Sequence, residues 1–273
     1  DDEELDPFIG RERELAGMST AFQKVIREWS GQLVLLLGDR GLGTSTVVSR
    51  FREQACAIEK DLLWVEAHCR DEATRPYAVF GRMLRSHFGV PPQFDDWMAG
   101  ESFLAKVEEL YTPEEQSTAK EMAWLVGFLV GFKVEGSPYL SPSDDEVQTL
   151  VPRASQGLMR LISKLAFQRP TIVVVDDAHH ASAPLIALLD LLTAGMATVP
   201  VMLLVVGRSE LRQANPGWQK RDVIELKPLG RVESERTLMG LLSGIEVVPR
   251  DLVERVVDKS GGNPYAMRGI VRY

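Results

Sequence analysis

Short apolar runs alternate with amphipathic segments along the chain. The runs have the length of strands, and the continuous run at 33–37 is typical of a strand covered on both faces. They lie at 33–37, 62–67, 171–177, 199–207 and 222–229. Strands that alternate with helices predict a parallel sheet between helices, so we expect an α/β fold.

The segments between these runs carry apolar residues every three or four positions, which predicts amphipathic helices. They cover 15–29, the stretch after the glycine-rich segment at 38–43, 76–88, 153–168, the stretch from 183 onward, and two helices after 229. Ser182 stands where a helix N-cap residue is expected. The stretch at 89–151 is irregular and acidic, so we expect a helical insertion with mobile loops, poorly anchored to the sheet.

Composition limits the classes of function that the chain can have. Its 273 residues carry a net charge of −8, which argues against a nucleic-acid binding surface. The two cysteines form no metal-binding or disulfide pattern, so a reducing cytoplasm is the expected compartment. The apolar stretch 122–132 is shorter than the roughly 20 residues of a membrane span, which favours a buried helix and no membrane partner. The chain begins without methionine or a signal peptide, so we expect a piece of a longer protein.

The segment "GDRGLGTSTVV" (38–48) directly follows a predicted buried strand and leads into a predicted helix. Glycines let a backbone approach an anion closely, and the free N–H groups of a helix N-terminus attract phosphate. The spacing of Gly38, Gly43 and Ser45 is that of a phosphate-binding loop, except that Thr44 occupies the position of the usual lysine. Glycines also build ordinary tight turns, so the segment alone leaves both interpretations open.

Two carboxylates end the predicted strand at 171–177. Asp176 and Asp177 stand at its carboxyl end, the side of a parallel sheet where ligands bind. A carboxylate at this place orients Mg²⁺ in P-loop proteins, and a hydroxyl such as that of Ser45 supplies another ligand. The alternative is that the two aspartates only cap the next helix.

Several segments, in this order, resemble the STAND-class AAA ATPase domains of multidomain signalling regulators, kinases and cyclases. They are "PFIGRERELAGM" (7–18), "RPYAVFGRMLR" (75–85), "IVVVDDAHHAS" (172–182), "MLLVVGRSEL" (202–211), "LKPLGRVESERTLMGLL" (226–242) and "GGNPYAM" (261–267). The resemblance implies a three-layer P-loop NTPase fold, with a five-stranded parallel sheet and helices on both faces. It implies a P-loop domain at 1–230, with the insertion at about 90–150, and the start of a helical lid at 231–273.

The resemblance also implies the residues of the site. Asp177 and Arg208 would be catalytic, Asp177 by polarising the attacking water and Arg208 as a sensor or interface arginine. Ser45 and Asp176 would hold Mg²⁺. The residues that would bind the ATP or ADP cofactor are Ile9, Gly10, Arg11, Gly38, Arg40, Gly41, Gly43, Thr44, Ser45, Thr46, Asn263 and Pro264.

Three positions depart from the family pattern, and all of them weaken the prediction of catalysis. Thr44 replaces the lysine, His180 the usual tryptophan and Ser182 the usual aspartate. A lysine contact with phosphate is worth about 4 kcal/mol at an effective dielectric near 20, before desolvation. Threonine can donate a hydrogen bond to phosphate but cannot neutralise it, so we expect weak or absent ATP hydrolysis and weak or lost nucleotide binding.

The sequence therefore predicts a nucleotide-binding regulatory switch or scaffold. Its expected partners are other domains of the same polypeptide or another protein, with a homo-oligomer as an alternative. Three other functions stay open: an active ATPase that uses another cation such as Arg40, a protein-interaction domain that binds no nucleotide, and a dinucleotide-dependent oxidoreductase. In the last, "GDRGLG" would be the dinucleotide turn and Glu66 would hold a ribose.

Overall fold

The structure is a computed structural model that describes residues 9–69, 76–218, 222–243, 245 and 248–272. Residues 7, 8 and 75, which belong to two of the family motifs, lie outside these ranges. The chain divides into two compact units. One comprises Asp1–Ala21, Val34–Ile58 and Val206–Tyr273, and the other comprises Phe22–Leu33 and Glu59–Val205.

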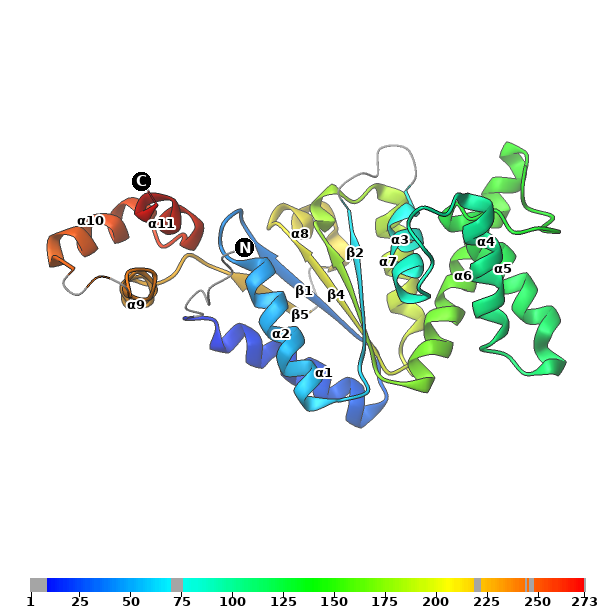
Figure 1. Cartoon of the computed structure of the whole chain (residues 1–273), viewed down its shortest axis with the longest axis horizontal. Coiled ribbons are helices and arrows are strands. Elements are labelled where there is room, and N and C mark those ends of the chain that lie inside the picture. The colour runs from blue at the N-terminus through cyan, green and yellow to red at the C-terminus, as the bar shows by residue number, and fades with distance from the viewer. Residues whose placement is uncertain (1–8, 70–75, 219–221, 244, 246–247, 273) are drawn as a thin grey trace. The chain divides into compact units, whose positions relative to one another are not determined.

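Five strands form one sheet, in the order β2-β3-β4-β1-β5 (Figure 1). They are β1 (Gln32–Gly38), β2 (Leu63–His68), β3 (Thr171–Asp176), β4 (Val201–Gly207) and β5 (Asp222–Leu226). The pairs β1–β5, β2–β3 and β3–β4 are parallel. Strand β4 is buried along its whole length, as the continuous apolar run predicts. The predicted parallel α/β fold is confirmed.

Strand β5 ends three residues earlier than the apolar run that predicted it. The chain leaves the sheet there because Pro228 has no N–H to donate to a ladder, and the next N–H, of Leu229, donates to the carbonyl of Gly262 at 2.8 Å. This bond fixes the chain between β5 and the C-terminal helices.

The unit that contains β5 also holds the glycine-rich loop and the C-terminal helices. Its helices are the first part of α1 (Glu12–Glu28), α2 (Thr44–Ile58), α8 (Glu210–Ala214), the 3-10 turn η3 (Pro216–Trp218), α9 (Arg231–Leu241), α10 (Arg250–Ser260) and α11 (Pro264–Val271). Helices α9, α10 and α11 share a small core of their own, made by Leu238, Val256, Val257 and Met267. The loop and these three helices therefore belong to one packed unit.

The other unit carries the insertion, which is helical as expected. Its elements are α3 (Ala78–His87), α4 (Asp96–Glu108), η1 (Pro113–Glu115), α5 (Gln116–Val130), α6 (Asp144–Gln168), η2 (Ala178–His180) and α7 (Ala183–Gly195). Helix α5 packs on α3, α4 and α6, and most of its apolar residues are buried. A Cβ added to Gly81 of α3 would lie only 2.8 Å from the Val130 carbonyl oxygen, so these two helices meet closely.

Helix α6 begins at Asp144, whereas the sequence predicted a start at 153. Ser143 and Glu146 form a capping box, in which the Glu146 carboxylate accepts hydrogen bonds from the Ser143 N–H and hydroxyl, both at 2.8 Å. This start signal outweighs Pro152, which lies inside the helix. None of the described helices combines the length and the apolar composition that a membrane crossing requires.

Candidate functional site

The glycine-rich loop joins β1 to α2 with two glycines in the left-handed region. Gly41 has φ +86° and Gly43 has φ +89°, conformations that other residues adopt only with strain. The Leu42 N–H donates to Asp39 at 3.2 Å, and the Val47 N–H donates to Gly43 at 2.9 Å. Helix α2 begins at Thr44, so its first amides have no intrahelical acceptor and carry the positive end of the helix dipole.

Helix α11 is tied to this loop by two hydrogen bonds. The Asn263 side-chain amide donates to the Arg40 carbonyl at 3.0 Å, and the Tyr265 N–H donates to the Gly41 carbonyl at 3.2 Å. The Asn263 side-chain oxygen also caps α11 by accepting from the Ala266 N–H at 3.1 Å. A Cβ added to Gly41 would lie 2.6 Å from that oxygen, so only glycine fits beside it.

Residues 9–11, which precede α1, also contact the loop. The Arg11 side chain is buried and donates to the Leu42 carbonyl at 3.1 Å, and it pairs with Glu14 at 3.3 Å. Gly10 has φ +78°, and a Cβ added there would lie 2.7 Å from Glu233 Cγ of α9. Gly10 and Arg11 thus contact α9 and the loop, respectively.

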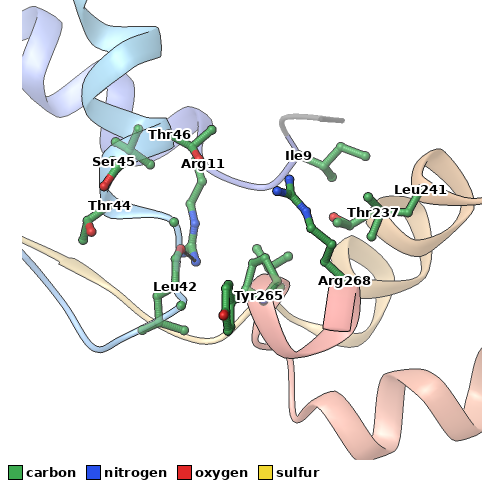
Figure 2. A pocket seen from close by; sticks show the side chains of 15 residues that line it. Ile9, Arg11, Leu42, Thr44, Ser45, Thr46, Thr237, Leu241, Tyr265 and Arg268 are labelled. Carbon is green, nitrogen blue, oxygen red and sulfur yellow. Dashed lines mark hydrogen bonds between the residues drawn. The ribbon is translucent and has the colours of Figure 1, made fainter. Parts of the chain in front are cut away.

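These parts enclose a cavity of about 270 Å³ (Figure 2). The residues that line it are Ile9, Arg11, Gly41, Leu42, Gly43, Thr44, Ser45, Thr46, Val47, Leu229, Thr237, Leu241, Pro264, Tyr265 and Arg268. Two arginines and no carboxylate stand among these described residues. In a chain with a net charge of −8, a cavity with this lining is suited to an anion.

The cavity brings together eight of the predicted cofactor-binding residues. They are Ile9, Arg11, Gly41, Gly43, Thr44, Ser45, Thr46 and Pro264. Gly10 and Asn263 lie next to lining residues in the chain, and Asn263 holds the loop. Gly38 ends β1, and a Cβ added to it would lie 2.9 Å from the methyl group of the lining residue Thr44. Arg40 is exposed and does not belong to the described lining. Arg268 of α11 does line the cavity, although no motif in the sequence marked it.

The two aspartates lie in the other unit, at the carboxyl end of β3. The Asp176 carboxylate accepts from the Asp177 N–H at 2.7 Å, and Asp177 has φ +54°, unusual for a residue other than glycine. His68 ends β2 in register with Asp176, and its Nδ1 lies 3.5 Å from an Asp176 oxygen. His68 Nε2 lies 3.7 Å from a Glu66 oxygen. His68 therefore contacts one of the predicted metal ligands, Asp176.

Arg208 directly follows β4 and is partly buried, and its carbonyl accepts from the Leu211 N–H at 3.0 Å. Ser182 is the N-cap residue of α7 as predicted, but its hydroxyl makes no capping bond. It is buried without a hydrogen-bond partner in the described structure.

The strand order excludes the oxidoreductase alternative. In the dinucleotide-binding fold, the first strand lies next to the second. Here β1 lies between β4 and β5, and β2 pairs with β3. In addition, the Glu66 carboxylate accepts a hydrogen bond from the Trp64 indole N–H, so it is already engaged.

A family model described as "AAA ATPase domain" matches residues 7–206. The chain belongs to the AAA ATPase domain family. Domains of this family generally bind a nucleotide with Mg²⁺.

The similar proteins support this membership at the level of the fold. Cdc6p from Pyrobaculum aerophilum is 14% identical, with a TM-score of 0.59 over 98% of this chain and 62% of that chain. The Aeropyrum pernix ORC1 protein, solved in complex with DNA, is 16% identical, with a TM-score of 0.58 over 98% of this chain and 60% of that chain. "Uncharacterized protein R02095" of Rhizobium meliloti (strain 1021) is 22% identical over 98% of this chain. The chain spans 25% of that relative's length.

Proposed function

We propose that this AAA ATPase domain binds ATP or ADP with Mg²⁺ and serves as a regulatory switch within a larger signalling protein, with slow hydrolysis. The observation that carries the proposal is the cavity beside the glycine-rich loop. Its lining combines the loop, the first turn of α2 and two arginines without any described carboxylate. Backbone amides, a helix N-terminus and arginines are the groups that bind phosphates.

The residues that line the cavity suit the phosphates of a nucleotide. The loop from Gly41 to Thr46 would hold the phosphates, and the charges of Arg11 and Arg268 would balance theirs. Ser45 and Asp176 would hold Mg²⁺, since hydroxyl and carboxylate oxygens suit this ion. Among the described residues, no three His, Cys, Asp or Glu side chains gather into a metal site. We therefore propose that the nucleotide phosphates supply most of the ligands of Mg²⁺.

Hydrolysis of ATP requires positive charge beside the phosphates and a residue that orients or deprotonates the attacking water. Asp177 would orient the water, and Arg208 would act as the sensor or interface arginine. Thr44 would donate a hydrogen bond but leaves the transition state without the positive charge of the usual lysine, and such charge is the main catalytic device in phosphoryl transfer. We therefore propose turnover close to background.

A second candidate is an active ATPase in which Arg268 replaces the lysine. Its support is the position of Arg268 among the lining residues, on the helix that Asn263 and Tyr265 tie to the loop. Arg11 also lines the cavity, where it pairs with Glu14 and donates to the Leu42 carbonyl.

We further propose that residues 231–273 form the start of a lid, because α9 and α11 supply one side of the cavity. The expected partners are other domains of the same polypeptide or another protein, or a second copy of the chain. The STAND-class resemblance and the alignment with a quarter of R02095 support a module within a larger protein. One fold neighbour was solved with DNA. The net charge of −8 supports a protein partner here instead.

Two measurements on the same preparation test this proposal. The first is calorimetric titration with ATP, ADP and NAD, with and without Mg²⁺, and the second is the rate of phosphate release from ATP. We expect heat for ATP and ADP, a requirement for Mg²⁺, no heat for NAD, and phosphate release near background. Rapid phosphate release would favour the active ATPase. If neither ATP nor ADP binds, the result would favour the alternative of a protein-interaction domain that binds no nucleotide.

A further inference from the structure

Thr237 places a buried hydroxyl in the wall of the cavity. The residue lies on α9 and is 6% exposed, and its Oγ1 has no hydrogen-bond partner. In a helix, a threonine hydroxyl usually donates to the carbonyl four residues before it. Thr20 and Thr193 do so here, at 2.8 Å and 2.7 Å. Thr237 does not, although an unpaired buried hydroxyl is unfavourable.

Part of the cavity lining that Thr237 belongs to is apolar. Ile9, Leu229 and Leu241 line the cavity together with Thr237. In the view of Figure 2, Thr237 and Leu241 lie on one side, Thr44, Ser45 and Thr46 on the other, and the Arg268 side chain extends between them. One end of the cavity is therefore suited to phosphates. The other end, where Thr237 stands near Ile9 and Leu241, is largely apolar and is suited to a flat heteroaromatic base.

We propose that the Thr237 hydroxyl hydrogen-bonds the nucleotide base and makes the site selective for adenine over guanine. This inference rests on the proposed function, since it requires a nucleotide in the cavity. A hydroxyl is both a donor and an acceptor, so it can pair with the amino group or a ring nitrogen of adenine. Guanine presents a ring N–H beside its amino group, and both need acceptors. The described lining contains no Asp, Glu, Asn or Gln side chain to accept them.

The variants Thr237→Val and Thr237→Ser test the inference in the full chain. Valine keeps the shape of threonine and removes the hydroxyl, whereas serine keeps the hydroxyl. Each protein is titrated with ATP, with GTP and with inorganic triphosphate, which has no base, always with Mg²⁺. Thr237→Val is expected to weaken ATP binding about tenfold and to reduce the preference for ATP over GTP. Thr237→Ser is expected to retain both, and inorganic triphosphate is expected to bind all three proteins alike.

The melting temperature of each ligand-free protein separates recognition of the base from a structural role. Thr237→Val removes an unpaired hydroxyl, so its ligand-free form should melt at the same or a higher temperature than the wild type. A lower melting temperature, an unchanged affinity for ATP, or an equal loss of triphosphate binding would each overturn the inference. If the wild type binds inorganic triphosphate but does not bind ATP more tightly, the base site is refuted while the phosphate site stands. If the wild type binds neither, the proposed function itself fails.

Discussion

Thr44→Lys restores the charge that the loop of this AAA ATPase domain lacks. Thr44 is the first residue of α2, is partly buried and lines the cavity. A Cβ added to Gly38 would lie 2.9 Å from the Thr44 methyl group, so this methyl faces the end of β1. A lysine stem that starts from the same place can extend along the loop toward the site of the phosphates.

The size of the effect follows from two opposing contributions. The attraction between a lysine and a phosphate about 4 Å away is about 4 kcal/mol at an effective dielectric near 20. Fixing the side chain costs up to about 2 kcal/mol of rotamer entropy. A net gain of about 2 kcal/mol corresponds to roughly thirtyfold tighter binding of ATP. In the ligand-free protein the change is mildly unfavourable, by about 0.3–1 kcal/mol, because a cation meets the positive end of the α2 dipole.

Thermal unfolding with and without ATP and Mg²⁺ measures both contributions. At a ligand concentration of 100 times Kd, binding adds about 2.7 kcal/mol of stability, which raises the melting temperature of a chain of this size by about 5–10 °C. We expect a shift of this order for Thr44→Lys in millimolar ATP, a much smaller one for the wild type, and a slightly lower melting temperature without ligand. Thr44→Gln is the control for side-chain length without charge. Equal ligand shifts for the lysine and glutamine variants would refute the reasoning.

Five further variants test other parts of the site. Arg268→Ala should weaken ATP binding about tenfold, whereas Arg40→Ala should change it little, and titration of both decides which arginine faces the phosphates. Gly41→Ala should lower the free energy of unfolding by about 1–2 kcal/mol, measured by urea denaturation; Gly43→Ala, with a similar φ but open space around its Cβ, should lower it less. Arg208→Ala should fold normally but weaken nucleotide binding, measured by calorimetry, or self-association, measured by sedimentation. If neither changes, Arg208 has no role in the site or in assembly.

The strands and the loop could be predicted because their signals are local. The apolar run at 33–37 and the glycines after it specify β1 and the turn from neighbouring residues alone. The start of α6 was predicted late, at 153, because the capping box formed by Ser143 and Glu146, which decides where the helix begins, was not recognised in the sequence. Local patterns of this kind carry little information about what a distant helix contributes.

Thr237 and Arg268 could not be predicted as cavity residues, because tertiary packing brings them there. Thr237 lies on the buried side of α9 and reads as an ordinary core position, and nothing near it in the sequence marks a binding site. Arg268 lies one helical turn after Pro264, so a signal existed in the spacing from that motif, but only the bonds between α11 and the loop give it meaning. Arg40 looked closer in sequence, yet its side chain is exposed.

Hydrogen exchange of the full chain, with and without ADP and Mg²⁺, tests most directly the central claim that the nucleotide lies in the cavity beside the loop. The account predicts slower exchange of the amides at 41–47 and in the segments around Thr237 and Arg268, because these segments line the same cavity. If calorimetry detects binding while exchange in these segments stays unchanged, the nucleotide binds elsewhere and the account is contradicted.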